Sequence, residues 1–323
     1  MNPLEKVKYV TDSIHEAAKK TDGVRALSYV DIIWCGIRYG ASPNNYVNFD
    51  LKNTCSAERK TFLTHRKSQY LMKRFNNPNY IWQVENKYEF AKLIGKKYGR
   101  GFAKSKTLTK EDLLVISNKG RIIYKPLRGG QGIGIKVFET GSYSNLKELL
   151  SAIHSLPDGI VEEWIVQDEK MSSLYPDAVN PIRIQSLRTD EVHIIAATIT
   201  IANGTNIANA SGVKAIFALI DVDNGTVITD GYDYNGNLYT THPTTGVVIK
   251  GFRIPQWDKV VSLINQSAKK IKNIRYIGWD IAISKDGPII IEANNDPGYT
   301  AYQLPVLTGS HKGIWSIYKK YMN

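Results

Sequence analysis

The N-terminal quarter of the chain has the apolar spacing that is typical of helices. Apolar residues recur at helical intervals over 7–18 and over 26–37. Residues 58–75, ERKTFLTHRKSQYLMKRF, form a basic amphipathic pattern, for which a solvent-exposed helix face is a simpler interpretation than membrane or partner binding. The cluster NNPNY at 76–80 breaks the pattern. These features predict a helical N-terminal region over residues 1–75.

From residue 121 onwards the pattern changes to short apolar runs separated by turns. RIIYKP reads as a strand, and RGGQGIGIKVFE reads as a glycine-rich turn that leads into a second strand. PIRIQSLRT and VHIIAATITI are expected to form a hairpin, and WDIAISKDGPIIIEAN predicts another about the turn SKDGP. Helices are expected at about 87–98, 144–154 and 255–272. The chain is therefore predicted to be an α+β protein with much antiparallel sheet.

The composition is that of an ordinary globular protein. Of the 323 residues 42% are hydrophobic and 22% are charged, and no apolar run is long enough to span a bilayer. The polar, mixed-charge N-terminus does not resemble a secretory signal. Cys35 and Cys55 suggest neither a disulfide framework nor a zinc site. We therefore expect a cytoplasmic protein without a membrane span.

The net charge of +12, from 42 basic and 30 acidic residues, has three interpretations. The simplest is a compositional bias, because Lys, Asn, Ile and Tyr are all frequent. The second is an anionic small-molecule substrate. Nucleic-acid binding comes last, because no dense Lys/Arg block with interleaved aromatic residues occurs. We expect no nucleic-acid partner.

Asp280, Glu292 and Asn294 are predicted to lie on one face of the last hairpin. Residues i and i+2 of a strand share a face, so Glu292 and Asn294 point the same way. Pairing about SKDGP places Asp280 opposite Glu292, where like charges about 4.5–5.5 Å apart destabilise each other. Three oxygen-bearing side chains with room for water and phosphate suit Mg²⁺ better than Zn²⁺ or a caged Ca²⁺. The alternative is a pair of solvated carboxylates at the end of a sheet.

The glycine-rich segment RGGQGIG lies between two predicted strands. It is therefore not a dinucleotide-binding fingerprint, which needs a following helix, and it lacks the Gly-Lys-Ser/Thr of a Walker loop. Its backbone N–H groups are able to approach a triphosphate, and a mobile hairpin tip is the alternative. Lys125, just before the segment, is placed to bring an ammonium group to such phosphates or to lie at the surface.

Two further strands carry charged residues among apolar neighbours. IVEEWI at 160–165 has two glutamates, and its backbone is suited to follow an adenine edge with an acidic side chain near the ribose. Arg183 in NPIRIQ would be costly to bury unless a carboxylate or a bound phosphate pairs with it. Lys214 in SGVKAIF raises the same question less sharply.

These segments, in this order, resemble the ATP-grasp superfamily and most closely the sugar-transfer-associated ATP-grasp proteins. The similarity extends from about residue 87 to 303 and is strongest in YKPLRGGQGIGI, VEEWI, NPIRI with the later THPTTG, and IGWDIAI with IIIEANNDPG. The resemblance implies an ATP-grasp fold, in which two α+β subdomains clamp ATP, with a helical N-terminal extension. It divides the chain into the helical region 1–75, a lid subdomain 76–161 with the glycine-rich hairpin, and a C-terminal subdomain 162–323 with the metal site.

The resemblance also implies roles for individual residues. Lys125 would contact the nucleotide phosphates, and Lys104 would be a second nucleotide-contacting lysine. The phosphate lid would be formed by Gly129, Gly130, Gln131, Gly132 and Gly134. The adenine hinge would be Glu162, Glu163, Trp164 and Ile165, with Asp168 or Glu169 near the ribose. The magnesium ligands would be Asp280, Glu292 and Asn294.

The implied activity is that of an ATP- and Mg²⁺-dependent carboxylate–amine ligase acting through an acyl phosphate. Its substrate would be an anionic, sugar-linked or amino-acid-like molecule of polysaccharide or cell-surface glycan synthesis. In D-alanine-ligase-like members an arginine lies two residues before the metal aspartate, but this position is Gly278 here. Arg183, helped by Lys214, is the candidate catalytic replacement. Without a replacement, an ATP-dependent kinase is the alternative, and a non-catalytic nucleotide-binding module is the third possibility.

Overall fold

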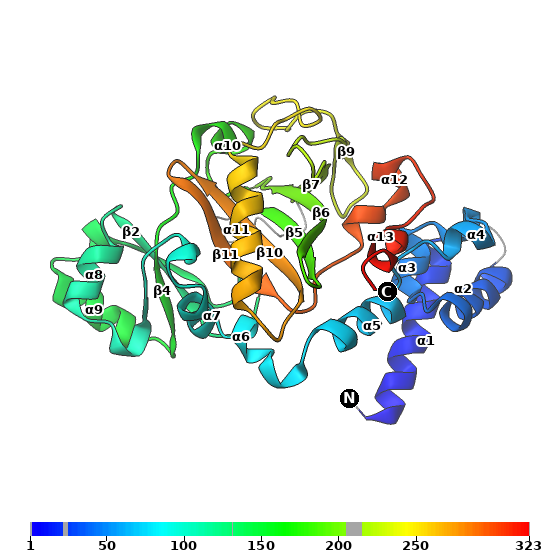
Figure 1. The fold of residues 1–323 in the computed structure, drawn as a ribbon, viewed down its shortest axis with the longest axis horizontal. Coiled ribbons are helices and arrows are strands. Elements are labelled where there is room, and N and C mark those ends of the chain that lie inside the picture. The colour runs from blue at the N-terminus through cyan, green and yellow to red at the C-terminus, as the bar shows by residue number, and fades with distance from the viewer. Residues whose placement is uncertain (1, 22–24, 131, 205–214, 323) are drawn as a thin grey trace. The chain divides into compact units, whose positions relative to one another are not determined.

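The computed structural model describes residues 2–21, 25–130, 132–204 and 215–322 (Figure 1). It divides into two compact units, one formed by Met1–Arg74 with Gly298–Asn323 and the other by Phe75–Pro297. The predicted division at 75/76 and 161/162 stays a prediction; the compact units keep 75–297 together and place 298–323 with the N-terminal helices. None of the helices in the described residues is long and apolar enough to cross a membrane.

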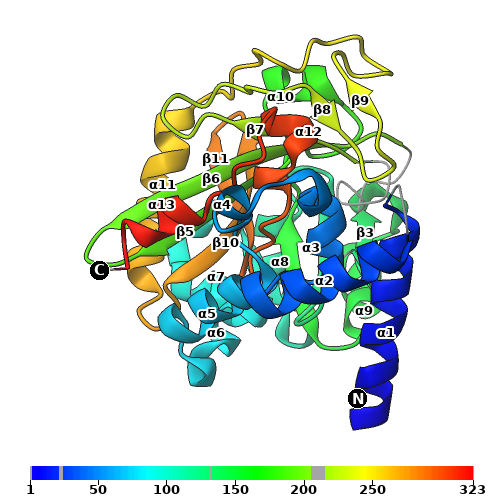
Figure 2. The ribbon, with the colours of Figure 1, turned by 90° about the vertical axis from the view of Figure 1, so that its right-hand side faces the viewer.

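The first unit is helical, as the apolar spacing predicts. Asn2 and Glu5 form a capping box at the start of α1, and Ser42 caps α3. Helix α1 packs against α2 and α3 (Figure 2), and the stacked rings of Phe49 and Phe62 lie in the core. The helices are α1 (Pro3–Lys19), α2 (Arg25–Tyr39), α3 (Pro43–Asn48), η1 (Leu51–Asn53), α4 (Ser56–Arg59) and α5 (His65–Phe75), with η6 (Ala301–Gln303), α12 (Pro305–Thr308) and α13 (Trp315–Lys319) from the C-terminal segment.

One buried side chain ties the C-terminal segment to the N-terminal helices. The Gln303 amide accepts a hydrogen bond from the Leu63 N–H at 3.0 Å and donates one to the Leu63 carbonyl at 2.8 Å. Since these groups are buried, the amide satisfies backbone polar atoms that water does not reach.

The second unit begins with a four-stranded antiparallel sheet in the order β1-β4-β2-β3. Apolar residues of α8 and α9 pack against this sheet (Figure 1). The glycine-rich segment connects β2 to β3, as predicted. The elements are α6 (Trp82–Glu85), α7 (Lys87–Ile94), η3 (Gly95–Tyr98), β1 (Phe102–Lys104), η4 (Ser105–Thr107), α8 (Lys110–Ile116), β2 (Arg121–Pro126), β3 (Lys136–Glu139), η5 (Thr140–Ser142), α9 (Leu146–His154) and β4 (Gly159–Glu163), preceded by η2 (Pro78–Tyr80).

A seven-stranded antiparallel sheet in the order β11-β10-β5-β6-β7-β8-β9 completes the second unit. The amphipathic helix α11 crosses this sheet (Figure 1) and contacts β5, β6, β10 and β11. Its buried apolar residues join the inward faces of these strands in the largest core cluster. The elements are α10 (Glu169–Leu174), β5 (Ile182–Arg188), β6 (Val192–Ile201), β7 (Ile216–Ile220), β8 (Gly231–Tyr232), β9 (Leu238–Tyr239), α11 (Trp257–Lys270), β10 (Tyr276–Ser284) and β11 (Gly287–Asn294).

The register of the central strands places four polar residues in one row across the sheet. Glu292 on β11 pairs with Asp280 on β10, Asp280 pairs with Arg183 on β5, and Arg183 pairs with Thr198 on β6. A β-bulge follows Asp280. The predicted pairing of Asp280 with Glu292 is therefore present, and the row extends to Arg183.

Candidate active site

Arg183 and Asp280 form a bidentate ion pair at the centre of this row. The Arg183 Nε and Nη2 atoms donate to the Asp280 Oδ1 and Oδ2 atoms, each at 2.7 Å. The side chain of Arg183 is 41% exposed and that of Asp280 is 12% exposed. The guanidinium group is thus held in a fixed orientation by the carboxylate while part of it faces solvent.

Glu292 lies beside this pair in a setting that disfavours its charge. Burial raises the pKa of Glu292, and the neighbouring Asp280 carboxylate raises it further, whereas Lys87 lowers it. The Asn294 amide donates to Glu292 Oε1 at 3.3 Å. Two carboxylates and an amide therefore converge, as predicted, where an additional cation would be stabilising.

If these three side chains bind a metal, they would fit Mg²⁺ better than a metal that needs a dense ligand cluster. Among the described residues, no group of three or more His, Cys, Asp or Glu side chains is placed to hold a metal ion. Mg²⁺ keeps several waters and needs only one or two carboxylates, so Asp280, Glu292 and Asn294 provide enough protein ligands.

Close packing against Pro297 requires glycine at position 278 and leaves no space for an arginine side chain. A Cβ atom added there would lie 2.8 Å from the Cβ of Pro297. No side chain fits at this position without moving Pro297, so the arginine found here in D-alanine-ligase-like proteins has no room.

A cavity of about 370 Å³ joins the glycine-rich segment to the end of β11. Lys87 lines this cavity, and its Nζ atom donates to the carbonyl of Gly129, another lining residue, at 2.6 Å. The cavity is lined by Val84, Glu85, Lys87, Arg128, Gly129, Gly130, Glu292, Ala293, Asn294 and Asn295. Two cationic side chains, a glycine-rich backbone and two of the predicted metal ligands therefore border one space.

Three glycines of the glycine-rich segment have backbone conformations that favour glycine. Gly129, Gly132 and Gly134 have φ values of 98°, 74° and 76°, which L side chains rarely adopt. A Cβ atom at Gly129 or Gly130 would meet nothing within 4 Å, so both backbones are open to a ligand. Gln131 lies outside the described residues.

Lys87 and Arg128 were not predicted as functional residues from the sequence. Lys87 is the first residue of α7, where the helix dipole disfavours a cation unless an anion lies nearby. Burial lowers the pKa of Lys87, and the Glu292 carboxylate opposes this. A lysine at the first position of a helix was the signal available in the sequence.

Lys125 belongs to a buried cluster of charges around Glu162. Its Nζ atom lies 2.7 Å from Glu162 Oε2, and Arg100 Nη2 lies 2.8 Å from Glu162 Oε1. The Tyr98 hydroxyl also donates to Glu162 Oε1, and Arg100 Nη1 donates to the Ile290 carbonyl at 2.5 Å. Burial alone would raise the pKa of Glu162, but Arg100 and Lys125 lower it to about 2. The cluster thus connects β4 of the small sheet to β11 of the large one.

None of the four predicted hinge residues lines the 370 Å³ cavity. Glu162 pairs through its backbone with both β1 and β2, which engages its main chain in the sheet. Glu163 accepts from the Gly101 N–H at 3.0 Å. Trp164 follows β4 and stacks under the Arg121 guanidinium at 5.4 Å, and Ile165 follows it in the chain.

The remaining predicted residues lie elsewhere in the second unit. Lys104 pairs with Asp158 at 3.1 Å on β1, and it does not line the cavity. Asp168 caps α10 by accepting from Lys170 N at 2.9 Å, and Glu169 is the first residue of that helix. Lys214 lies outside the described residues.

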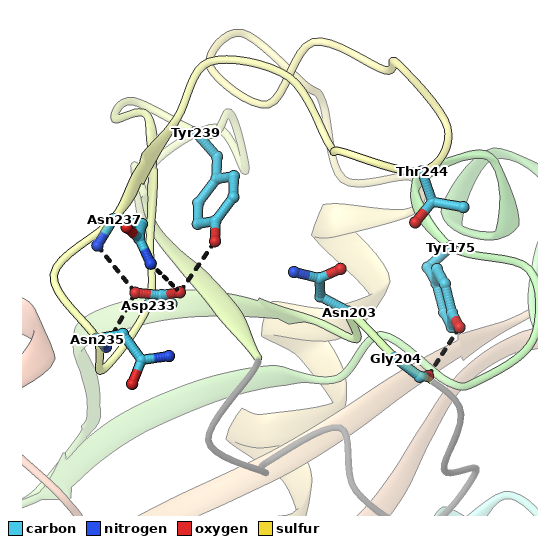
Figure 3. A pocket seen from close by; sticks show the side chains of 8 residues that line it. All are labelled: Tyr175, Asn203, Gly204, Asp233, Asn235, Asn237, Tyr239 and Thr244. Carbon is cyan, nitrogen blue, oxygen red and sulfur yellow. Dashed lines mark hydrogen bonds between the residues drawn. The ribbon is translucent and has the colours of Figure 1, made fainter.

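A second cavity, of about 540 Å³, lies near the ends of β6, β8 and β9 (Figure 3). Buried Asp233 accepts hydrogen bonds from Asn235 N, Asn237 N, Asn237 Nδ2 and the Tyr239 hydroxyl, between 2.9 and 3.0 Å. These bonds lower the pKa of Asp233 against the effect of burial. The lining residues are Tyr175, Asn203, Gly204, Asp233, Asn235, Asn237, Tyr239 and Thr244. Within the part of the chain that the structure describes, the lining residues are all polar or glycine, and none is a Lys or Arg.

Buried polar residues hold the walls of this second cavity. Asn180 donates to the Met171 and Tyr175 carbonyls at 3.0 and 2.9 Å and accepts from Ala202 N at 3.1 Å. His242 Nε2 lies 2.9 Å from the Ala202 carbonyl, and burial lowers the pKa of this imidazole. Asn180 of NPIRI and His242 of THPTTG therefore both contact Ala202, the residue before the lining residue Asn203.

Comparison with known proteins identifies the family. Residues 66–315 match the family model described as sugar-transfer associated ATP-grasp. No curated protein sequence matches the chain.

Several solved structures are similar at low identity. The ADP complex of purK, N5-carboxyaminoimidazole ribonucleotide synthetase, has 13% identity and a TM-score of 0.42, covering 73% of this chain and 52% of that chain. The ATP-grasp ligase PsnB complexed with minimal precursor has 16% identity and a TM-score of 0.42, and the match covers 81% of this chain and 70% of that chain. The L-amino acid ligase from Bacillus licheniformis has 13% identity and a TM-score of 0.42, and the match covers 74% of this chain and 48% of that chain. The chain spans about half the length of the first and third of these proteins.

The family model matches most of the chain, from residue 66 to 315, and includes both sheets and the row from Arg183 to Glu292. This confirms the fold class and the resemblance predicted from the sequence. The chain belongs to the sugar-transfer associated ATP-grasp family.

Proposed function

We propose that the protein is an ATP- and Mg²⁺-dependent carboxylate–amine ligase that acts through an acyl phosphate. The observation that carries this proposal is the 370 Å³ cavity. There the glycine-rich turn, Lys87 and Arg128 face Glu292 and Asn294. Phosphates, a divalent cation and their counter-charges have complementary partners in this one space.

The triphosphate would lie between the glycine-rich backbone and the two cationic side chains. Gly129 and Gly130 leave their backbones open, and Lys87 and Arg128 supply positive charge. Lys125 lies at the buried Glu162 cluster and would support the phosphates from the adjacent strand β2.

Mg²⁺ would be held by Asp280, Glu292 and Asn294, and it would neutralise charge on the transferring phosphoryl group. The raised pKa of Glu292 supports this assignment, because a cation beside it would offset both its burial and the Asp280 charge. The Asp280 side chain also keeps the Arg183 guanidinium in its fixed orientation.

Arg183 would bind the reacting carboxylate. Its guanidinium is oriented by Asp280, is partly exposed, and lies in the row that contains two of the proposed metal ligands, Asp280 and Glu292. A fixed cation there would orient the substrate carboxylate and stabilise negative charge that develops on the acyl phosphate. Lys214 is proposed to help, as the sequence suggested.

The second cavity would hold the remainder of the substrate, a neutral hydroxyl-rich group such as a sugar. Its amide and hydroxyl groups both donate and accept hydrogen bonds, and its carboxylate is already satisfied. Its described lining residues include no Lys or Arg to pair with an anion. Asn203 follows Thr198, the β6 partner of Arg183, by five residues, which span at most about 16 Å. The substrate would thus combine a carboxylate near Arg183 with a sugar further along the sheet, in polysaccharide or cell-surface glycan synthesis.

A kinase is the second candidate, because Gly278 replaces the arginine of D-alanine-ligase-like proteins. Mass spectrometry distinguishes the ligase from the kinase. The reactions contain ATP, Mg²⁺, hydroxylamine and a pool of amino acids, uronic acids and nucleotide sugars. The ligase predicts ADP together with a hydroxamate. ADP with a stable phosphorylated product and no hydroxamate would contradict it in favour of the kinase.

A further inference from the structure

Helix α2 is apolar on two opposite faces. Its inner face buries Ile32, Cys35 and Tyr39 in the core of the first unit. An amphipathic surface helix would carry polar residues on the other side. Here that side carries Leu27, Val30, Ile33, Trp34 and Ile37, with exposed fractions between 49% and 70%.

These five residues form one continuous stripe, which we call the outer face of α2. Their spacing places them within about a third of the helix circumference at 3.6 residues per turn. A single exposed apolar residue needs no explanation, but a contiguous exposed patch marks an interaction surface. The outer face of α2 is therefore a candidate docking surface.

Two arginines lie beside Ile37, at the C-terminal end of this face. Arg38 is exposed beside Ile37, and Arg66 donates to the Ile37 and Arg38 carbonyls at 3.1 and 3.3 Å. Asp31 is the only acidic residue of α2, and its carboxylate is bound by Arg59 through two 2.7 Å bonds. The outer face of α2 thus carries positive charge without a competing carboxylate from its own helix.

The positive charge of the protein is concentrated in the same unit. Residues 1–74 and 298–323 contain 16 basic and 7 acidic residues, a net charge of +9. Residues 75–297 contain 26 basic and 23 acidic residues, a net charge of +3. Most of the net positive charge therefore lies in the first unit, whereas the proposed nucleotide site lies in the second. Binding of an anionic nucleotide or substrate at that site does not explain the charge of the first unit.

We propose that the outer face of α2 docks the protein on an anionic membrane surface. A tryptophan with aliphatic neighbours, bordered by arginines, is the composition that inserts at the boundary between headgroups and acyl chains. The surrounding basic unit attracts anionic lipids. A second copy is a poorer occupant, because it would bring one unit of charge +9 against another.

The test is flotation of the full-length protein with vesicles of phosphatidylcholine containing about 30% phosphatidylglycerol, compared with pure phosphatidylcholine. Wild-type protein is expected to float with the anionic vesicles at low salt and to be released at high salt. The double variant Trp34→Ser/Ile37→Ser keeps the net charge, and we expect it to lower the bound fraction about ten-fold or more. Ile228→Ser/Val248→Ser, at exposed apolar positions of the other unit, is the matched control and is expected to bind as wild type.

Circular dichroism and thermal unfolding serve as the check that both double variants are folded. Failure of the wild type to bind the anionic vesicles at low salt would overturn the proposal. Binding that the Trp34/Ile37 variant retains in full would also overturn it, because attraction by charge alone would then suffice. A wild-type dimer that this variant dissociates, without vesicle binding, would assign the face to a second copy instead.

Discussion

Arg183 on β5 and Asp280 on β10 lie directly opposite each other, and two hydrogen bonds of 2.7 Å join the guanidinium to the carboxylate. The pair links the two proposed functions of the row, because Asp280 belongs to the metal set and Arg183 to the substrate set. The orientation of Arg183 thus depends on the Asp280 side chain.

Replacing Arg183 should affect chemistry more than nucleotide binding. We expect Arg183→Ala to lower the turnover of ATP about 100-fold while the affinity for ATP changes little, because the lost cation stabilises charge only as the acyl phosphate forms. Arg183→Lys keeps the charge but loses the bidentate fork, and should give an intermediate rate. Steady-state kinetics with titration of ATP binding measure both quantities. Equal losses of turnover and affinity would make Arg183 a nucleotide anchor.

Replacing Glu292 should separate stability from activity. Glu292→Gln removes a carboxylate whose charge is disfavoured by burial and by Asp280, so the melting temperature should stay the same or rise. ATP turnover should nevertheless be abolished, as it should in Asp280→Asn. Thermal unfolding and ADP release measure the two effects. Asp286→Asn, in the exposed turn of the same hairpin, is the control, and full activity in Glu292→Gln would remove the metal-site assignment.

The buried Glu162 cluster should make the stability of the second unit sensitive to acid. Arg100 and Lys125 lower the pKa of Glu162 from 4.5 to about 2 in the folded protein. A depressed carboxyl pKa contributes stability that is complete above the unfolded value and is lost as the pH falls from about 4.5 towards 2. Urea unfolding between these pH values should show this slope.

The variant Glu162→Gln should lower stability at neutral pH and flatten that slope, because it leaves two buried cations unpaired. Glu139→Gln removes an exposed carboxylate paired with Arg121 and should keep the wild-type slope. A slope unchanged in Glu162→Gln would show that other carboxyl groups cause the acid sensitivity.

Gly278 should tolerate no side chain. We expect Gly278→Ala to destabilise the protein by about 1–3 kcal/mol, because its Cβ would overlap Pro297. Gly141→Ala, where a Cβ would meet nothing within 4 Å, should have little effect. Chemical unfolding compares the two. A stable Gly278→Ala would mean that Pro297 yields easily, and it would contradict the packing requirement at Gly278.

The sequence predicted the pairing of Asp280 with Glu292 because a short turn fixes the register of a hairpin. The partner of Arg183 was left open between a carboxylate and a phosphate. The reason is that β5 and β10 are far apart in the chain, and their adjacency is a property of the sheet order. The same holds for Glu162, whose partners Tyr98 and Arg100 come from another segment.

Local packing also altered one predicted helix. Residues 58–75 were predicted as a continuous amphipathic helix, but α4 ends at Arg59 and α5 begins at His65. Phe62 and Leu63 are fully buried in the interruption, and the Thr64 hydroxyl donates to the Tyr39 carbonyl at 2.7 Å. Tertiary burial thus overrode the helical spacing.

The central claim is that the cavity beside Glu292 binds the phosphates of ATP, and Lys87 tests it most directly. The measurement is calorimetric titration of a non-hydrolysable ATP analogue with Mg²⁺ into wild type, Lys87→Ala and Lys92→Ala. Lys92 is an exposed lysine of the same helix, paired with Glu89, and does not line the cavity. We predict that Lys87→Ala weakens binding about 10-fold or more, as expected for loss of a charged hydrogen bond, while Lys92→Ala binds as wild type. Equal affinity of all three proteins for the analogue would contradict the assignment.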